Sequence, residues 1–331
     1  MIETYGYARA GFLGNPSDGY FGKTLSFAMS NFRARVLLYP SGRLEIKPSK
    51  VDLPVFENLD DLYRITRWRG YYGGIRIIQA LIVRLVDYCR EQGIELPDRN
   101  FTLEYESNVP QRLGLGGSSA IITASLRALC QYYGLEIPLP VQANLALETE
   151  TRELNVPAGL QDRVVQAYGG LVYMDFSRSL MEARGYGEYE RMDAGLLPNV
   201  YVAYRTSLSE GTEVFHSTLR ERWLRGDPEV VEAMNAWAGY AAEGRTCLLA
   251  RNYSRLSQLV DANFDLRAKI YHIDQGNLEM VRMARAAGAT ANFAGSGGAI
   301  VGTYDDSAMF DRLKAAGKAI GVAVILPKIV G

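Results

Sequence analysis

The pattern of apolar positions predicts strands and then a helix in the first third of the chain. Apolar side chains dominate residues 32–38, which end at Pro40-Ser41-Gly42 and are followed by a shorter run at 44–47. This arrangement predicts a β-hairpin. From 74 to 90, apolar residues recur every three or four positions, which predicts a helix with one buried face. Residues 101–106 alternate between apolar and polar side chains, as in a half-buried strand.

A glycine-rich loop at 114–119 follows that strand, and a helical stripe extends from the loop to Tyr133. Another helix is predicted over 141–154. Pro157-Ala158-Gly159 separates it from a helix that begins near Leu160.

The second half of the chain predicts a mixture of long helices and short strands. A polar stretch, 177–195, lies between two predicted strands and marks a domain boundary. We therefore expect an α+β protein with an N-terminal domain at 1–195 and a C-terminal domain at 196–331. The predicted helices are 228–249, 253–273 and 277–287, and the predicted strands are 171–174, 200–204, 299–304 and 323–326.

Composition excludes several classes of function. The 331 residues include 36 Lys and Arg against 37 Asp and Glu, so no basic excess favours nucleic acid or an anionic membrane as a partner. The three cysteines lack metal-ligand spacing, and no signal peptide or long apolar run occurs, so we expect a cytoplasmic protein with core thiols. Two histidines argue against a His/Cys zinc centre, whereas Mg²⁺ on carboxylates and hydroxyls stays open.

The loop from Gly114 to Ala120 has the chemistry of a phosphate site. It lies between a predicted strand and a predicted helix, where backbone N–H groups and the helix dipole can bind an anion. Glycines let the backbone approach phosphate, and the hydroxyls of Ser118 and Ser119 can bind an oxygen or a metal. The alternative is a tight turn with an ordinary helix N-cap. Other phosphate motifs fit less well, because Ser17 replaces the first glycine of a Walker A sequence before Lys23.

Two further features could complete such a site. The glycine cluster at 295–298 is short and flanked by apolar residues, so it indicates close packing against a ligand or loop, or close strand packing alone. Carboxylates gather at Glu148, Glu150, Glu153 and Asp162, where one could hold a metal and another accept a proton. A solvated acidic helix end is the alternative for Glu148 and Glu153. Asp162 has apolar neighbours, which indicate a partly buried site.

Together these segments resemble the three motifs of the GHMP small-molecule kinases. Residues 8–18 resemble the N-terminal motif, 114–120 the central phosphate loop, and 288–298 the C-terminal motif. The resemblance implies a two-domain α+β fold, with a left-handed β-α-β unit in the N-terminal domain and a ferredoxin-like C-terminal domain. It also implies ATP and Mg²⁺ as cofactors. Asn292 departs from the family, because many relatives carry Lys there.

Several stretches, including 159–176 and 263–267, are most similar to the glucuronokinase family, whose members phosphorylate D-glucuronate at its anomeric hydroxyl. This resemblance implies that Asp162 is the catalytic base, Arg9 the basic residue beside it and Asp18 an acceptor for a sugar hydroxyl. It implies Ser118 or Ser119 and Glu150 as Mg²⁺ ligands, with Glu148 as the alternative to Glu150. The implied nucleotide-binding residues are Gly114, Leu115, Gly116, Gly117, Ser118, Ser119, Gly295, Gly297 and Gly298.

A uronate substrate needs a partner for its carboxylate, and an arginine fork can grip it with two hydrogen bonds. Arg112 and Arg267 are the candidates, although either could form a structural ion pair instead. Tyr72 is a candidate sugar-binding aromatic residue, with a core role as the alternative. Other possible functions are a kinase for a heptose or galacturonate, or a sensor that binds sugar or nucleotide without turnover. The oligomeric state is not predicted.

Overall fold

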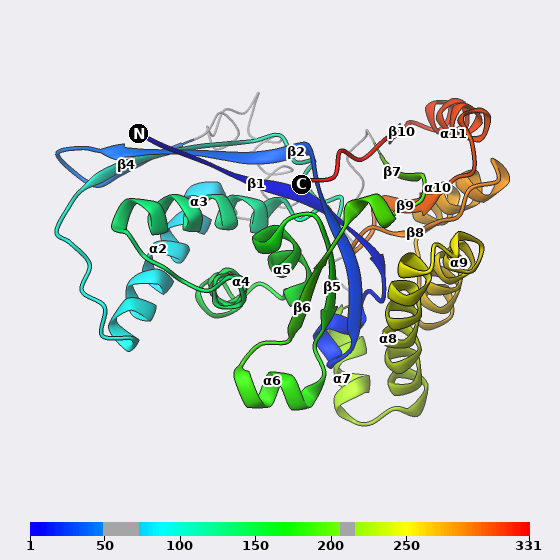
Figure 1. The fold of residues 1–331 in the computed structure, drawn as a ribbon, viewed down its shortest axis with the longest axis horizontal. Helices are drawn as coiled ribbons and strands as arrows, with labels where there is room; N and C mark the ends of the chain where they lie inside the picture. Colours follow the sequence, from blue (N-terminus) through cyan, green and yellow to red (C-terminus); the bar gives the residue numbers. More distant parts are fainter. Residues whose placement is uncertain (49–72, 206–215) are drawn as a thin grey trace, which may run out of the picture. The chain divides into compact units, whose positions relative to one another are not determined.

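The computed structural model describes residues 1–48, 73–205 and 216–331 (Figure 1). The chain forms two compact units and crosses between them several times. The first unit comprises 1–7, 32–109 and 117–167, and the second comprises 8–31, 110–116 and 168–331. The expected domain boundary at residue 195 lies within the second unit and stays a prediction.

The strands of the first unit contradict the predicted hairpin. Strand β2 (Lys23–Pro40) pairs antiparallel with β4 (Phe101–Ser107), and β3 (Glu45–Lys47) pairs parallel with the other edge of β4. Strand β4 thus lies between the two segments that were expected to pair. The alternating strand β4 offers seven residues to β2, whereas β3 offers only three, so the longer ladder forms with β4.

Helices α2 (Gly74–Glu91) and α3 (Gly117–Tyr133) pack against each other, as the apolar periodicity predicts. Strand β1 (Ile2–Leu13) runs close to α3, where Thr4 Oγ1 donates a hydrogen bond to Ala124 O over 2.7 Å. Helix α4 (Leu139–Glu148) stops earlier than expected. It continues as a π-helical turn (Thr149–Glu153), and α5 (Leu160–Tyr168) follows. The register of the acidic segment therefore changes within the predicted helix 141–154.

In the second unit, the start of β2 pairs with β5 (Leu171–Asp175), and β5 pairs with β6 (Glu188–Met192). The polar composition of residues 177–195 predicts a connection, yet these residues contain α6 (Arg178–Arg184) and β6. Strand β6 was missed because its sequence, Glu-Tyr-Glu-Arg-Met, is mostly polar. Its pairing with β5 depends on the backbone.

A four-stranded antiparallel sheet in the order β10-β7-β9-β8 forms the rest of the second unit, together with helices that include the side-by-side pair α8 and α9 (Figure 1). Three helices begin after an aspartate whose side chain caps the first turn, namely Asp227, Asp274 and Asp306. The strands are β7 (Val200–Arg205), β8 (Asn292–Phe293), β9 (Ala299–Thr303) and β10 (Val322–Ile325). The helices are α7 (His216–Leu224), α8 (Pro228–Leu249), α9 (Tyr253–Ile270), α10 (Gln275–Ala286) and α11 (Ser307–Ala319).

The main core of this unit joins the four-stranded sheet to the helices through Tyr201, Phe264, Met280 and Ile300. The three cysteines are buried free thiols, as expected. None of the helices in the described ranges is long and apolar enough to cross a membrane.

Candidate active site

The first turn of α3 meets the π-helical turn through one short hydrogen bond. Ser118 Oγ donates to Glu150 Oε1 over 2.7 Å, and the Glu150 side chain is buried. Ser119, the other candidate hydroxyl, is fully buried in the same turn. The hydroxyl and carboxylate expected to act together therefore do lie together, at the positive end of a helix dipole.

Glu148 has different surroundings from Glu150. Its carboxylate pairs with Arg84 Nε at 2.9 Å and with Arg152 Nη2 at 3.1 Å. Both of its oxygens are thus held by arginines, whereas one oxygen of Glu150 is bound to a serine hydroxyl. This difference favours Glu150 as the carboxylate available to a cation.

The donor pair Ser118 and Glu150 fits Mg²⁺ that arrives with a nucleotide. Both side chains offer the oxygen atoms that this ion prefers, and in kinases phosphates and water usually complete its coordination. Within the described ranges, no group of three or more His, Cys, Asp and Glu side chains could hold a metal ion. The hydroxyl and the single carboxylate can therefore bind Mg²⁺ only together with further oxygen ligands from the nucleotide.

Asp162 lies in the first turn of α5, and its neighbour Arg163 connects it to Glu150. Arg163 Nη1 is 3.5 Å from Asp162 Oδ2, and Arg163 Nε donates to Glu150 Oε2 over 2.9 Å. Arg163 Nη2 also donates to Glu150 Oε2, and Nη1 donates to Gly159 O over 2.8 Å. One buried guanidinium thus contacts the carboxylates of both Glu150 and Asp162.

In the second unit, Arg9 joins the two glycine-rich loops. It lies on β1, is 5% exposed, and its Nη1 donates to Gly114 O over 2.7 Å and also to Ala294 O. Its backbone N donates to Leu115 O over 3.1 Å. The central and C-terminal motifs are therefore tied to the strand that carries the N-terminal motif.

The same two loops approach each other too closely for side chains. A Cβ added to Gly114, where φ is +60°, would lie 2.7 Å from Ser296 N. A Cβ on Gly295 would overlap Gly114 O and reach the guanidinium of Arg9. Loop-to-loop packing, one of the two interpretations of the 295–298 cluster, is confirmed.

Arg267, on α9, is the most deeply buried candidate for substrate binding. Its side chain is 3% exposed, and its Nη1 donates to Gly295 O over 3.0 Å. Its guanidinium lies over the rings of Tyr271 and Phe293, 5.3 Å and 5.1 Å from their centroids. Burial lowers the pKa of Arg267, and the negative charge of Asp18 acts in the opposite direction. Arg267 and Asp18 therefore belong to one electrostatic environment beside the second glycine loop.

Three buried amides connect the N-terminal and C-terminal motifs. Asn263 Oδ1 accepts from Gly14 N over 2.8 Å, and its Nδ2 donates to Asn15 O and to Asn292 Oδ1, each over 3.2 Å. Asn292 Nδ2 donates to Asn15 Oδ1, and Asn15 Nδ2 donates to Phe293 O. Asn292, the departure from the family pattern, is thus one member of an uncharged buried network, and we call Asn15, Asn263 and Asn292 the amide triad.

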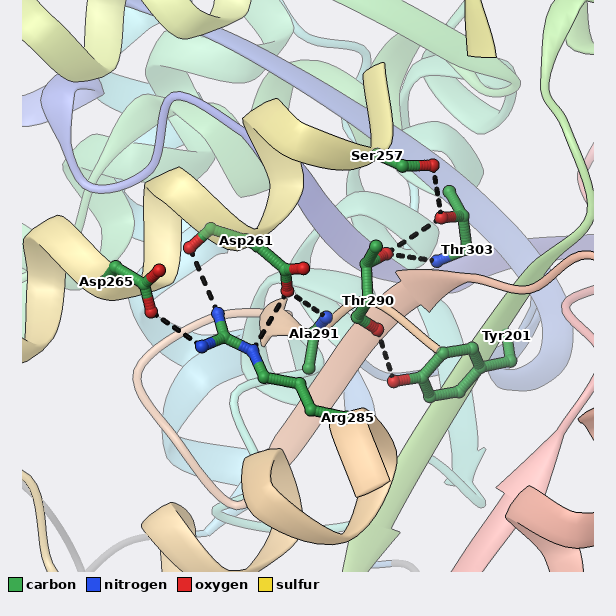
Figure 2. Close-up of polar contacts among 8 residues, drawn as sticks. All are labelled: Tyr201, Ser257, Asp261, Asp265, Arg285, Thr290, Ala291 and Thr303. Carbon is green, nitrogen blue, oxygen red and sulfur yellow. Dashed lines mark hydrogen bonds and ion pairs between the residues drawn. The ribbon is translucent and has the colours of Figure 1, made fainter. Parts of the chain in front are cut away.

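A second network, shown in Figure 2, holds the backbone just before β8. Asp261 Oδ1 accepts from Ala291 N over 2.9 Å and from Arg285 Nε over 3.0 Å. Tyr201 donates to Thr290 O over 2.7 Å, and the Thr290 and Thr303 hydroxyls lie 2.8 Å apart. The chain thus enters the C-terminal glycine loop from a segment anchored by side chains on both α9 and β7.

The predicted site residues fall into two groups, each within one unit. Ser118, Ser119, Glu150 and Asp162 are gathered in the first unit, and Arg9, Asp18, Gly114, Gly295 and Arg267 in the second. Arg112 is half-buried in the loop before Gly114. Gly298 lies near the carbonyl of Arg112, and its N–H donates to Asn277 Oδ1 over 2.8 Å. Tyr72 lies outside the described residues.

Sequence analysis missed Arg163 and Asn263. A signal for Arg163 was available, because an arginine that lies directly between a candidate catalytic aspartate and Val164-Val165 needs a partner if it is buried. Asn263 gave no comparable signal, since a single amide in a long helix is common on protein surfaces.

Comparisons with known proteins show the family of this chain. The family profile described as "GHMP kinases N terminal domain" matches residues 80–170. Probable glucuronokinase 2 of Arabidopsis thaliana is 48% identical over 91% of this chain and 84% of its own length. Glucuronokinase 1 of the same plant is 45% identical with the same coverage.

A solved structure, galactokinase of Lactococcus lactis complexed with galactose, matches 99% of this chain and 93% of its own length with a TM-score of 0.80. Its sequence identity is 15%, so this likeness concerns the fold alone. It confirms the expected α+β arrangement.

Proposed function

Because the chain belongs to the glucuronokinase family of the GHMP kinases, we propose that it transfers the γ-phosphate of ATP to the anomeric hydroxyl of D-glucuronate with the help of Mg²⁺. The observation that best supports a kinase reaction is the set of contacts among Ser118, Glu150, Arg163 and Asp162. This set supplies a hydroxyl and a carboxylate for a cation next to a second carboxylate for a proton.

In the proposed reaction, the sugar oxygen forms a bond to the γ-phosphorus while the bond from that phosphorus to the β–γ bridging oxygen breaks. Asp162 accepts the proton of the attacking hydroxyl, and ADP leaves with the bridging oxygen. Arg9 is proposed, from the family resemblance, to be the basic residue of the reaction. Its contacts with both glycine loops support a role in fixing these loops as well.

Backbone N–H groups of residues 114–119 are proposed to bind the phosphates at the N-terminus of α3. Ser118 and Glu150 are proposed to hold Mg²⁺, which when bound neutralises phosphate charge. The residues Gly295, Gly297 and Gly298 are proposed to line the nucleotide site from the C-terminal motif. The close approach of Gly295 to Gly114 supports their assignment to one site.

Substrate choice is proposed to depend on Arg267, with Asp18 accepting a sugar hydroxyl. Arg267 is a buried cation beside the carbonyl of Gly295, Tyr271 and Asp18, and burial lowers its pKa. A substrate carboxylate would compensate such a charge, because charge-assisted hydrogen bonds are the strong ones. Arg112 is the second candidate.

The test is release of ADP from MgATP across a panel of neutral sugars, heptoses, galacturonate and glucuronate. We expect the highest kcat/KM on glucuronate, with the anomeric phosphate identified by ³¹P NMR. A higher kcat/KM on a heptose or galacturonate would reassign the substrate. A silent panel with tight nucleotide binding would favour a sensor.

A further inference from the structure

Arg163 divides the two oxygens of Glu150 between two different partners. Two nitrogens of Arg163, Nε and Nη2, donate to the same oxygen, Oε2, while Oε1 faces the hydroxyl of Ser118. A guanidinium more often takes both oxygens of a carboxylate. Here both donors of Arg163 bind Oε2, so Oε1 is left for the hydroxyl of Ser118.

The third nitrogen of Arg163 fixes the segment that carries Asp162. Nη1 donates to Gly159 O over 2.8 Å, just before α5, and lies 3.5 Å from Asp162 Oδ2. The side chain is 5% exposed, so water cannot readily replace these contacts. Arg163 thus holds the break between the π-helical turn and α5 in one geometry.

We propose that Arg163 is a positioning residue for phosphoryl transfer, which presents Oε1 of Glu150 to the nucleotide-bound cation and sets Asp162 at a fixed place relative to it. This inference rests on the proposed function. It assigns to Arg163 no contact with substrate. Its effect is transmitted through Glu150 and Asp162.

Arg84 offers a matched comparison within the same unit. It is 6% exposed, and it pairs with Glu148 at 2.9 Å and with Glu91 at 2.8 Å. Glu148 precedes Glu150 by two residues, but its other oxygen pairs with Arg152, and no serine contact comparable to that of Ser118 is found for it in the described ranges. Arg84 therefore represents a buried arginine that stabilises the fold without presenting a cation ligand.

The experiment compares Arg163→Lys, Arg163→Gln and Arg84→Lys in the full chain. Lysine keeps the charge but cannot donate from a planar fork, and glutamine removes the charge. For each protein, we would measure the melting temperature, kcat and KM, the Mg²⁺ concentration at half-maximal rate, and the binding of Mn²⁺ to the complex with a non-hydrolysable ATP analogue by electron paramagnetic resonance.

For both Arg163 variants, we expect the Mg²⁺ requirement to rise and Mn²⁺ affinity to fall by about 10-fold or more, as when the outer support of a metal ligand is removed. We expect kcat to fall while KM for glucuronate changes little, because no substrate contact is lost. Arg84→Lys should lower the melting temperature without changing either metal readout.

Folded Arg163 variants with wild-type Mn²⁺ affinity and Mg²⁺ requirement would overturn the proposal. So would a failure of both variants to fold, because Arg163 would then serve the fold itself. The Mn²⁺ measurement needs no sugar, so it stays informative if wild-type protein proves inactive on glucuronate. Inactivity of the wild-type protein on glucuronate would refute only the proposed substrate, and not the proposed role of Arg163.

Discussion

The hydroxyl of Ser118 and Oε1 of Glu150 lie 2.7 Å apart, so the start of α3 and the π-helical turn after α4 share one polar contact. An α-helical continuation of α4 would rotate Glu150 to another face, since a π-turn changes the angular position of every later side chain. The irregular turn is thus the local feature that gives Glu150 its partner. Several expectations follow from this contact and its neighbours.

Glu150→Gln and Ser118→Ala should each raise the Mg²⁺ concentration needed for half-maximal rate by about 10-fold or more, since each removes one proposed ligand. Glu148→Gln should leave this requirement unchanged and lower stability instead, because it removes the carboxylate charge that pairs with the buried Arg84. Steady-state rates over a Mg²⁺ series and thermal melts give the comparison. The opposite order for the two glutamates would move the proposed ligand by two residues.

Asp162→Asn should lower kcat by about 100-fold or more, the range in which a general base contributes. ATP affinity, measured by calorimetry, should stay near that of the wild type, because the side chain is proposed to act on the acceptor hydroxyl. A variant with undiminished kcat would remove Asp162 from the mechanism.

Arg267→Met should shrink the preference for glucuronate over glucose, which we expect to be about 100-fold in the wild type from charge-assisted hydrogen bonds. Arg112→Met is the matched variant and should keep the preference. The measurement is the ratio of kcat/KM values for the two sugars in proteins with comparable melting curves. A preference lost in Arg112→Met and kept in Arg267→Met would exchange the two assignments.

Asn263→Ala should lower the free energy of unfolding by about 3 kcal/mol, because it leaves Gly14 N and the amide of Asn292 without their partner in a buried place. The control is Asn100→Ala. This exposed side-chain amide donates to Gly42 O at 3.3 Å, and its loss should change stability by about 0.5 kcal/mol at most. Urea unfolding curves of both variants test this, and equal effects would show that the amide triad contributes little.

The stability of the second unit should depend on the charge of Asp261. Burial raises the pKa of Asp261 above its ordinary value, against the lowering effects of Ala291 N–H and Arg285. The native state therefore binds the proton more tightly than the unfolded chain, so this group's stabilising contribution is present at low pH and is lost as pH rises through the native pKa.

Asp261→Asn removes this titration. The unfolding free energy of the variant, relative to the wild type, should therefore increase between about pH 3 and about pH 7. Urea unfolding at the two pH values measures the difference, and a decrease would contradict the direction of the shift.

The sequence predicted the long helices and the glycine loops well, because apolar periodicity and glycine position depend on local chemistry. Helix α8 has the predicted bounds, and α3 begins one residue before Ser118. The apolar pattern did not predict the order of the strands in the sheets. The pairing of β2 with β4, and not with β3, depends on which distant backbone offers the longer ladder.

For the site too, local sequence predicted candidate residues but not the contacts between them. Ser118 and Glu150 could be selected as candidates from residue type and family motif, but their contact depends on a π-helical turn that no periodicity predicts. The contact of Arg163 with Glu150 depends on the break between the π-helical turn and α5, and the contact of Asn263 with Gly14 joins residues that are far apart along the chain.

The mutual approach of Gly114 and Gly295 also limits how this protein can be changed in the laboratory or by evolution. Any side chain at either position collides with backbone of the other loop, so neither can be relieved by trimming a neighbouring side chain. A second substitution in the facing loop therefore cannot compensate for a side chain added at Gly114 or Gly295. We therefore expect changes in sugar specificity to arise at proposed substrate positions such as Asp18, whose side chain can be exchanged, and not at these two glycines.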